Sequence, residues 1–127
     1  MPQDKPKPGR VLVVEDEDAI RLSLRDFLRG RGYEVLVASD GVGAIKQLLD
    51  NDVGVIISDY RMDILGGDYW VKFLARYCRD KKIILTSGFL RPDFKVPFEV
   101  VYKPFDYSEL EALVGRLASE ARNGRNP

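Results

Sequence analysis

The sequence contains no histidine, and its only cysteine is Cys78. Without histidine, the chain can form neither a Ser-His-Asp catalytic triad nor an imidazole metal site. A single cysteine excludes a disulfide within the chain. Because Cys78 lies in a stretch with helical periodicity, we predict a buried structural thiol there and no nucleophile.

The sequence also lacks an excess of positive or negative charge, and it lacks long apolar runs. The 20 basic and 20 acidic residues give a formal net charge of +0, so we expect no overall attraction to nucleic acid or to anionic membranes. No apolar run approaches the roughly 20 residues of a transmembrane helix, and the N-terminus lacks a signal-peptide core. We therefore expect a cytoplasmic protein that binds through a local site, without direct contact with nucleic acid or membrane.

The length of 127 residues is typical of one domain. Residues 1–9 are rich in proline and lysine and residues 122–127 are polar, so both are predicted to be disordered tails around a domain at 10–121. Short runs rich in valine and isoleucine, apolar on both faces as buried parallel strands are, occupy residues 11–15, 34–37, 53–58, 83–86 and 98–102.

Helical periodicity fills most of the intervals between these runs. The residues expected to face the core are Ile20, Leu24, Phe27 and Leu28; Val42, Ile45 and Leu49; Trp70, Phe73, Leu74 and Tyr77; and Leu110, Leu113, Val114 and Leu117. Gly30 and Gly32 are expected to end the first helix, and Asp106 with Glu109 is expected to cap the last one.

This alternation predicts an α/β fold with a doubly wound, five-stranded parallel sheet in the flavodoxin-like order 2-1-3-4-5. One connection differs from the others. Pro92 and Pro97 interrupt a crossover of only about eleven residues before the last strand, so helix 4 is predicted to be shortened or replaced by a loop. Ligands of such sheets bind beyond the carboxyl ends of the strands, where the strand order reverses.

Acidic residues gather at this predicted edge. Glu15 and Asp16 end the first strand, and Asp59 follows the third, which is its neighbour in the sheet. Clustered carboxylates repel one another unless a cation balances them. A hard divalent cation such as Mg²⁺ is one candidate. Lys103, at the end of the fifth strand, is another, and Thr86 brings a hydroxyl group to the same edge.

Five short motifs together resemble the receiver domain of two-component response regulators, over about residues 10–120. They are VLVVEDE, DGVGAI, VIISDYRM, LTSG and KPF, in the order and at nearly the spacing of that family. The resemblance implies a signalling domain that is no enzyme beyond promoting its own phosphorylation and dephosphorylation. It further implies that Asp59 accepts a phosphoryl group, and that Mg²⁺ is bound by Glu15, Asp16, Asp59 and the backbone carbonyl of Arg61.

The resemblance also implies how the phosphoryl group is held and sensed. Thr86 and Lys103 would bind its oxygens, and the Lys103–Pro104 peptide bond would be cis. Valine replaces the switch aromatic that many receivers have three residues before the lysine, so Tyr102 and Phe89 are the candidate substitutes.

The partners that the resemblance implies are a sensor histidine kinase or histidine phosphotransfer protein and a downstream protein. Since a short helix 4 alters the usual output face, we expect a monomer or a weak dimer. No effector segment follows the last helix, which favours a free-standing receiver. A receiver segment of a hybrid histidine kinase or larger regulator, and a pseudo-receiver that binds partners without phosphorylation, are the alternatives.

A metal-dependent hydrolase is disfavoured by the spacing of the acids. Phosphatases of the haloacid-dehalogenase type have a second aspartate two residues after the nucleophile, and Toprim-type nucleases need the same Asp-x-Asp spacing late in the sheet. The position two residues after Asp59 is Arg61.

Overall fold

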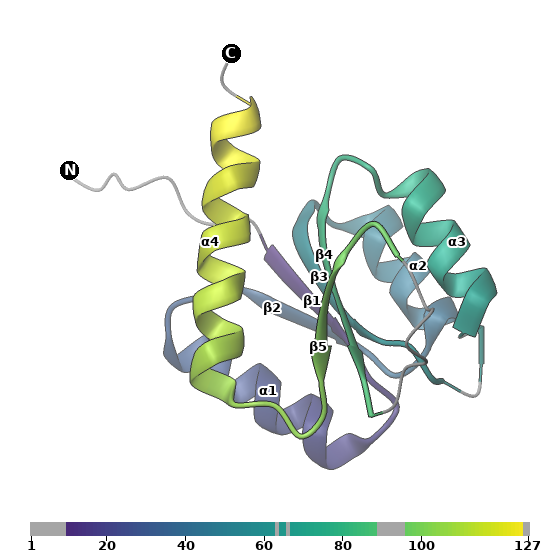
Figure 1. Cartoon of the computed structure of the whole chain (residues 1–127), viewed down its shortest axis with the longest axis horizontal. Helices are drawn as coiled ribbons and strands as arrows, with labels where there is room; N and C mark the ends of the chain where they lie inside the picture. The colour runs from purple at the N-terminus through teal and green to yellow at the C-terminus, as the bar shows by residue number, and fades with distance from the viewer. Residues whose placement is uncertain (1–9, 63, 66, 89–95, 126–127) are drawn as a thin grey trace.

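The computed structural model describes residues 10–62, 64–65, 67–88 and 96–125 of the chain. The elements in chain order are β1 (Arg10–Val14), α1 (Asp18–Gly30), β2 (Val35–Ala38), α2 (Gly41–Asp50), β3 (Val53–Asp59), α3 (Gly67–Tyr77), β4 (Lys82–Ser87), β5 (Glu99–Tyr102) and α4 (Tyr107–Arg125). Figure 1 shows one sheet with helices on both faces. None of the helices within the described ranges is long and apolar enough to cross a membrane.

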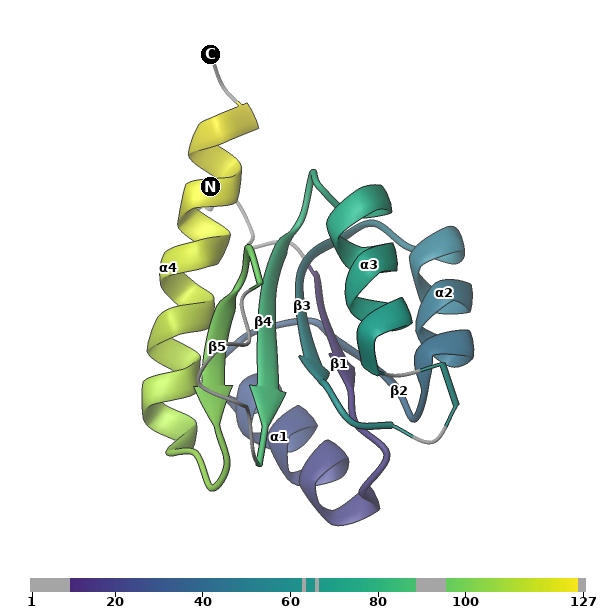
Figure 2. The ribbon, with the colours of Figure 1, turned by 45° about the vertical axis from the view of Figure 1, so that its right-hand side comes forward.

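The sheet is parallel throughout, in the order β2-β1-β3-β4-β5. The predicted flavodoxin-like order is therefore confirmed, and each predicted strand ends within one residue of the observed bounds. β3 is buried at every residue, because it lies at the centre of the sheet with a helical layer on each side. The strand arrows in Figure 2 point the same way, so the carboxyl ends of the strands share one edge.

Two helical layers divide the core between the faces of the sheet. α1 and α4 cover one face, and α2 and α3 cover the other (Figures 1 and 2). Successive residues of β1 alternate between them: Val11 and Val13 belong to the cluster with α1 and α4, whereas Leu12 and Val14 belong to the cluster with α2 and α3. Burial on both faces explains why the strand sequences are apolar throughout.

Asp40 and Asp106 cap the first turns of α2 and α4. Each accepts a hydrogen bond from the backbone N–H three residues further along, at 2.8 Å for Asp40 and 3.1 Å for Asp106. α1 ends at Gly30 as predicted, and Gly32 follows it with a φ of 96°, in the left-handed region that favours glycine.

Three side chains that we predicted to be in the core are exposed: Val42 (51%) and Leu49 (80%) on α2, and Tyr77 (66%) on α3. On α2 the buried positions are instead Gly41, which lies directly against Leu65 and has no room for a side chain, and Ala44, which belongs to the core cluster. The apolar spacing did not reveal that these small residues mark the inner face. At the end of α3 the core positions are Leu74 and Cys78, and Tyr77 lies outside them.

The connection from β4 to β5 consists of residues 88–98, and the described ones, 88 and 96–98, form no helix. The predicted loss or shortening of helix 4 concerns mainly residues 89–95, which lie outside the described residues. Phe98, at the end of this connection, is partly buried and packs against the same core cluster as α2 and α3.

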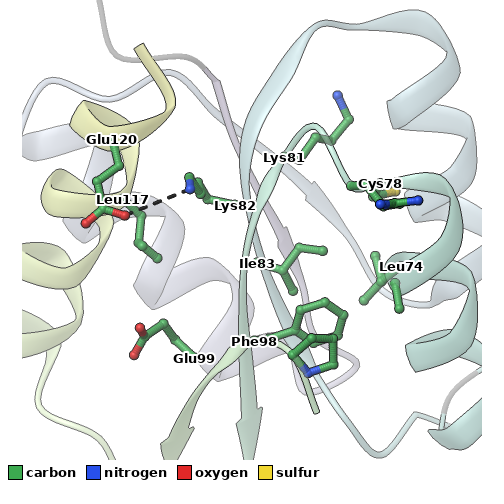
Figure 3. Close-up of a pocket in the computed structure, with 12 residues that line it drawn as sticks. Leu74, Cys78, Lys81, Lys82, Ile83, Phe98, Glu99, Leu117 and Glu120 are labelled. Carbon is green, nitrogen blue, oxygen red and sulfur yellow. Dashed lines mark ion pairs between the residues drawn. The ribbon is translucent and has the colours of Figure 1, made fainter. Parts of the chain in front are cut away.

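A pocket of about 570 Å³ remains between α3 and α4, at the amino-terminal ends of β4 and β5 (Figure 3). Leu74 approaches it from α3, Cys78 from the residue that follows this helix, and Ile83 from β4. Across its rim Lys82 Nζ lies 3.9 Å from Glu120 Oε1. Cys78 is buried as predicted, and burial raises the pKa of its thiol.

α4 continues to Arg125, beyond the predicted end of the domain at residue 121. The prediction of a disordered tail at 122–127 is therefore wrong up to Arg125. The backbone hydrogen bonds of a helix are internal, so α4 can extend beyond the boundary predicted from the apolar pattern. Residues 1–9, predicted to be the other tail, lie outside the described residues.

Candidate functional site

The residues singled out by sequence meet at the carboxyl edge of the sheet. Glu15 and Asp16 follow β1, and Asp59 is the last residue of β3. Thr86 lies opposite Asp59 in the register of β3 and β4. Lys103 follows β5, where its backbone N–H donates a hydrogen bond of 2.8 Å to the carbonyl of Ser87 in β4. Four strands of one parallel sheet thus bring together side chains that are far apart in the sequence.

Lys103 is the charged centre of this cluster. Its Nζ donates a hydrogen bond of 2.7 Å to Glu15 Oε1 and lies 3.5 Å from Asp59 Oδ2. The lysine side chain is 17% exposed, and the two carboxylate side chains are 4% and 7% exposed. The Lys103–Pro104 peptide bond, predicted to be cis, is cis in the structure. Lys103 therefore balances two acids that are almost wholly removed from solvent.

The loop after β1 is held by its own backbone and by Arg21. Glu15 Oε2 accepts a hydrogen bond of 3.0 Å from the N–H of Glu17. Arg21 Nη1 donates to the carbonyl of Glu15 at 2.9 Å, and Arg21 Nη2 donates to Asp18 Oδ1 at 2.6 Å. Glu17 and Asp18 are both exposed, and sequence analysis did not predict the role of Arg21. The spacing of three residues between Asp18 and Arg21 on α1 was the available signal.

Asp16 completes a group of oxygen donors. One carboxylate oxygen from each of Glu15, Asp16 and Asp59 lies within 4.8 Å of the others, a spacing that suits a metal ion. Asp16 is exposed, whereas the other two acids are buried. Asp59 and Lys103 also line an open hollow whose walls include Tyr60, Arg61 and Met62, so the buried site is accessible from solvent.

The electrostatics of the site reflect its burial. Burial raises the pKa of both Glu15 and Asp59, although the hydrogen bond and charge of Lys103 oppose this change. Burial on its own lowers the pKa of Lys103, but the hydrogen bond with Glu15 and the charge of Asp59 outweigh it, so that pKa is raised. Lys103 is therefore kept in its charged form, and its charge does not fully offset the effect of burial on the two acids.

Asp59 is also fixed through its backbone. Trp70 Nε1 donates a hydrogen bond of 2.7 Å to Ser58 Oγ, which in turn donates to the carbonyl of Asp59 at 3.1 Å. Sequence analysis predicted Trp70 as a core residue, and it is fully buried, but the link through Ser58 was not predicted. The available signal was a serine in an otherwise apolar strand, since a buried hydroxyl requires a partner.

The other predicted site residues are Thr86, Arg61, Tyr102 and Phe89. Thr86 is 2% exposed, and its carbonyl accepts a hydrogen bond of 2.8 Å from Tyr60 N–H. The side chain of Arg61 is exposed, and its backbone is hydrogen-bonded to Asp59. Tyr102 is 57% exposed. Phe89, the other candidate switch aromatic, lies outside the described residues.

Asp59→Asn is expected to stabilise the metal-free protein at neutral pH by about 1 kcal/mol, because the amide places no negative charge in the buried site. The folded-state pKa of Asp59 is raised, so the folded state binds more protons than the unfolded chain. Wild-type stability should therefore fall as the pH rises from the ordinary pKa of 3.8 through the raised folded value.

Urea unfolding with a chelator, below pH 3.8 and at neutral pH, measures this difference. The wild type and Asp59→Asn should agree in acid and diverge at neutral pH. Asp26→Asn is the control, because the Asp26 side chain is 66% exposed and should change stability little. Equal stability of wild type and Asp59→Asn at neutral pH would show that burial costs the carboxylate nothing.

Comparison with known proteins gives a consistent result. The family model of the response regulator receiver domain matches residues 11–115. The sensor kinase CckA of Brucella abortus is 33% identical over 115 residues, which cover 84% of this chain and 12% of that protein. The transcriptional regulatory protein PrrA of Mycobacterium bovis is 32% identical over 114 residues, covering 85% of this chain and 49% of that protein. The chain thus spans less than half the length of these relatives.

Solved structures agree with the fold. A receiver domain from the hybrid histidine kinase CckA superimposes with a TM-score of 0.74 at 33% identity, covering 87% of this chain and 99% of that domain. The receiver domain of the Francisella response regulator 1452 superimposes with a TM-score of 0.80 at 25% identity, covering 88% of this chain and 98% of that domain.

Proposed function

The chain belongs to the response regulator receiver domain family, and from this premise we propose that it is a phosphorylation-dependent switch whose phosphoryl acceptor is Asp59. The observation that supports the proposal best is the convergence of Asp59 with Glu15, Asp16 and Lys103 beside an open hollow. A phosphoryl donor can reach such a site from solvent, and the ammonium group of Lys103 can hold the transferred phosphoryl group. The chemistry modifies only the chain itself, so the protein acts as a switch and not as an enzyme on external substrates.

Mg²⁺ is the cofactor that fits this site. Its preferred ligands are hard oxygen donors, and Glu15, Asp16 and Asp59 supply them, with the backbone carbonyl of Arg61 as the fourth proposed contributor. The closeness of the three acids supports this assignment, because one carboxylate oxygen from each lies within 4.8 Å of the others. When bound, the ion offsets the charge on the phosphoryl oxygens during transfer.

Transfer proceeds by attack of an Asp59 carboxylate oxygen on phosphorus. The new O–P bond forms as the N–P bond of a donor phosphohistidine breaks, and the departing imidazole takes up a proton. Lys103 Nζ, already 3.5 Å from Asp59 Oδ2, binds one phosphoryl oxygen, and the Thr86 hydroxyl donates to another. These donors stabilise charge where it accumulates, which is the main form of catalysis in phosphoryl transfer.

Phosphorylation changes the balance of charge that holds the site in its present arrangement. It adds about −1.5 to −2 charges at Asp59. Lys103 must then divide its contacts between the phosphoryl group and Glu15, to which it is now bound at 2.7 Å. Since Lys103 adjoins β5 and Thr86 lies in β4, both strand ends respond, and the signal is a shift between two populations of the domain.

We propose a sensor histidine kinase or a histidine phosphotransfer protein as the phosphoryl donor, and a second protein as the receiver of the signal. The similarity to a receiver from a hybrid histidine kinase supports a role in such a relay. This similarity does not distinguish a free-standing receiver from a receiver within a longer regulator, because the site and its chemistry are the same in both.

Intact-mass measurement after incubation with Mg²⁺ and acetyl phosphate tests the function. The wild type should gain one phosphoryl group per chain, and Asp59→Asn and a chelated sample should gain none. Asp26→Asn is the matched control, because Asp26 is an exposed acid of α1 that pairs with Arg25 and lies outside the cluster of three acids. It should be phosphorylated like the wild type.

A phosphohistidine donor should follow if acetyl phosphate gives no product, because receivers can discriminate between donors. A chain that binds Mg²⁺ but accepts a phosphoryl group from neither donor would contradict the proposal. So would phosphorylation that persists in Asp59→Asn. The remaining explanation for an unreactive chain would be a pseudo-receiver that binds its partner without phosphorylation.

A further inference from the structure

The exposed apolar side chains of this protein are concentrated on one helical layer. Of the eight large apolar residues that are exposed in the described part of the chain, six belong to α2, to α3 or to the connection that precedes α3. These six are Val42 (51%), Leu49 (80%), Ile64 (54%), Leu65 (39%), Tyr69 (76%) and Tyr77 (66%). α2 and α3 lie side by side in both views of the ribbon (Figures 1 and 2). A concentration of this kind marks an interaction surface more often than scattered exposure does.

The outer side of α3 carries a continuous stripe. Tyr69, Lys72, Phe73, Arg76 and Tyr77 have the spacing i, i+3, i+4, i+7, i+8, which places them on one side of the helix. Each cation lies close to an aromatic ring: Lys72 Nζ is 5.5 Å from the Tyr69 ring centre, and the Arg76 guanidinium is 5.7 Å from that of Tyr77. The stripe therefore combines flat apolar surface with positive charge.

α2 presents a shorter stripe of the same character. Val42, Lys46 and Leu49 are separated by four and three residues, and they lie away from Ala44, which faces the sheet. Neither Val42 nor Leu49 contributes to the core. Their exposure is not needed for folding, since polar residues at these positions would leave the buried side of the helix unchanged.

The charges of this surface lack acidic partners. Within the described ranges, Lys46, Lys72 and Arg76 form no ion pair with a carboxylate. Asp68, at the start of α3, accepts a hydrogen bond of 2.6 Å from the Tyr60 hydroxyl group. A binding partner that fits the surface must therefore bring both apolar side chains and negative charge.

We propose that the outer face of α2 and α3 binds an acidic amphipathic helix of a partner protein. Leucine-like side chains of that helix would cover Val42, Leu49, Tyr69 and Tyr77, and its carboxylates would meet the three free cations. Recognition of an amphipathic helix by an apolar surface rimmed with charge is a common mode of binding. A second copy of this chain fits less well, because a two-fold interface would bring these cations against one another.

This surface is connected to the acidic site. The Trp70 ring stacks on Phe73 with centres 5.4 Å apart and an angle of 8°, and its N–H reaches the carbonyl of Asp59 through Ser58. A change at Asp59 can therefore alter the position of α3. This coupling rests on the proposed phosphorylation, whereas the docking itself depends only on the surface.

Backbone amide shifts of the isotope-labelled full chain, titrated with a synthetic helix of about 16 residues, test the docking. The peptide carries leucine on one face and glutamate elsewhere, and a second peptide replaces glutamate by lysine. The acidic peptide should shift resonances of α2 and α3, and the basic one should bind at least about tenfold more weakly. The titration uses Asp59→Asn without a phosphodonor, so its outcome does not depend on phosphorylation.

Two variants of the surface make the test specific. Tyr69→Ser with Tyr77→Ser, and separately Lys72→Glu with Arg76→Glu, should each weaken binding of the acidic peptide roughly tenfold or more. Leu22→Ser and Arg31→Glu on the opposite helical layer are the matched controls and should bind like the parent chain. Because the changed residues are exposed, thermal unfolding should show that every variant folds.

Three results would overturn the proposal. The acidic peptide could leave the α2 and α3 resonances unshifted, or it could bind the variants and the parent equally. Sedimentation could instead show a dimer that the tyrosine changes dissociate, which would assign the surface to a second copy of the chain.

Discussion

Lys103→Met is expected to lower the free energy of unfolding at neutral pH by about 2–3 kcal/mol, the largest loss for any change in the acidic site. Methionine retains much of the side-chain volume but leaves Glu15 and Asp59 as buried carboxylates without their common counter-charge. Uptake of a phosphoryl group should fall roughly a hundredfold or more, because a fixed donor to the phosphoryl oxygens is also lost. Urea unfolding with a chelator measures the first effect, and the mass assay measures the second.

The pH dependence of this variant follows from the same charges. Without Lys103, mutual repulsion raises the folded-state pKa values of Glu15 and Asp59 further, so the folded state binds more protons than the unfolded chain. Stability should fall as the pH rises above the ordinary pKa values of 3.8 for Asp59 and 4.5 for Glu15. The difference from the wild type should therefore be largest at neutral pH and smallest below pH 3.8.

Two matched variants separate charge from packing. Adding Glu15→Gln to Lys103→Met removes one of the uncompensated acids and should restore part of the lost stability. Lys82→Met breaks a pair that is 3.9 Å apart and exposed, and should cost less than about 0.5 kcal/mol. If Lys103→Met were as stable as Lys82→Met at neutral pH, the stability of the protein would not depend on Lys103 as a counter-charge for the buried acids.

Trp70→Ala is expected to destabilise the domain by about 3–5 kcal/mol, because Trp70 is fully buried and its removal leaves a large cavity between α3 and the sheet. Trp70→Phe should cost less, since a ring can still stack on Phe73, but it removes the N–H that Ser58 Oγ accepts at 2.7 Å. Ser58 Oγ keeps its own hydrogen bond to the carbonyl of Asp59 and loses only the donor to its oxygen, so we expect this loss to cost about 1 kcal/mol. Denaturant titration of the three proteins orders them as wild type, Trp70→Phe and Trp70→Ala.

Adding Ser58→Ala to Trp70→Phe tests the hydrogen bond separately. Ser58→Ala should cost less stability in Trp70→Phe than in the wild type, because in the double variant only the hydrogen bond from Ser58 Oγ to the carbonyl of Asp59 remains to be lost. Tyr77→Ala is the control for loss of an aromatic residue from α3, and its 66% exposure predicts a small effect. If Tyr77→Ala lost as much stability as Trp70→Ala, the stability of the domain would depend on the exposed end of α3.

The sequence was sufficient to predict the sheet and the position of the site. Strands buried on both faces must be apolar throughout, so their runs are visible without tertiary information. In a parallel sheet the residues that end the strands must share an edge, which brought Glu15, Asp59 and Thr86 together in the prediction. A short β4–β5 connection was also predicted from the sequence, because Pro92 and Pro97 cannot continue a helix.

Helical faces were harder to predict, because a helix that packs through small residues gives a misleading apolar pattern. On α2 the inner positions belong to Gly41 and Ala44, so Val42 and Leu49 face outward. Only the distance of the helix from the sheet decides this. The end of α4 was missed for a related reason, since a helix can extend past the last residue that touches the core.

Sequence alone thus determined where the strands lie and that Glu15, Asp16, Asp59 and Lys103 end strands at one edge, since apolar runs mark buried strands and the strands of a parallel sheet end at the same edge. Tertiary structure alone decided the contacts within the site. Lys103 binds Glu15 at 2.7 Å and Asp59 at 3.5 Å, Arg21 holds the carbonyl of Glu15, and Trp70 reaches Asp59 through Ser58. Hydrogen bonds depend on ångström distances and rotamers, and these are fixed only when the helices pack against the sheet.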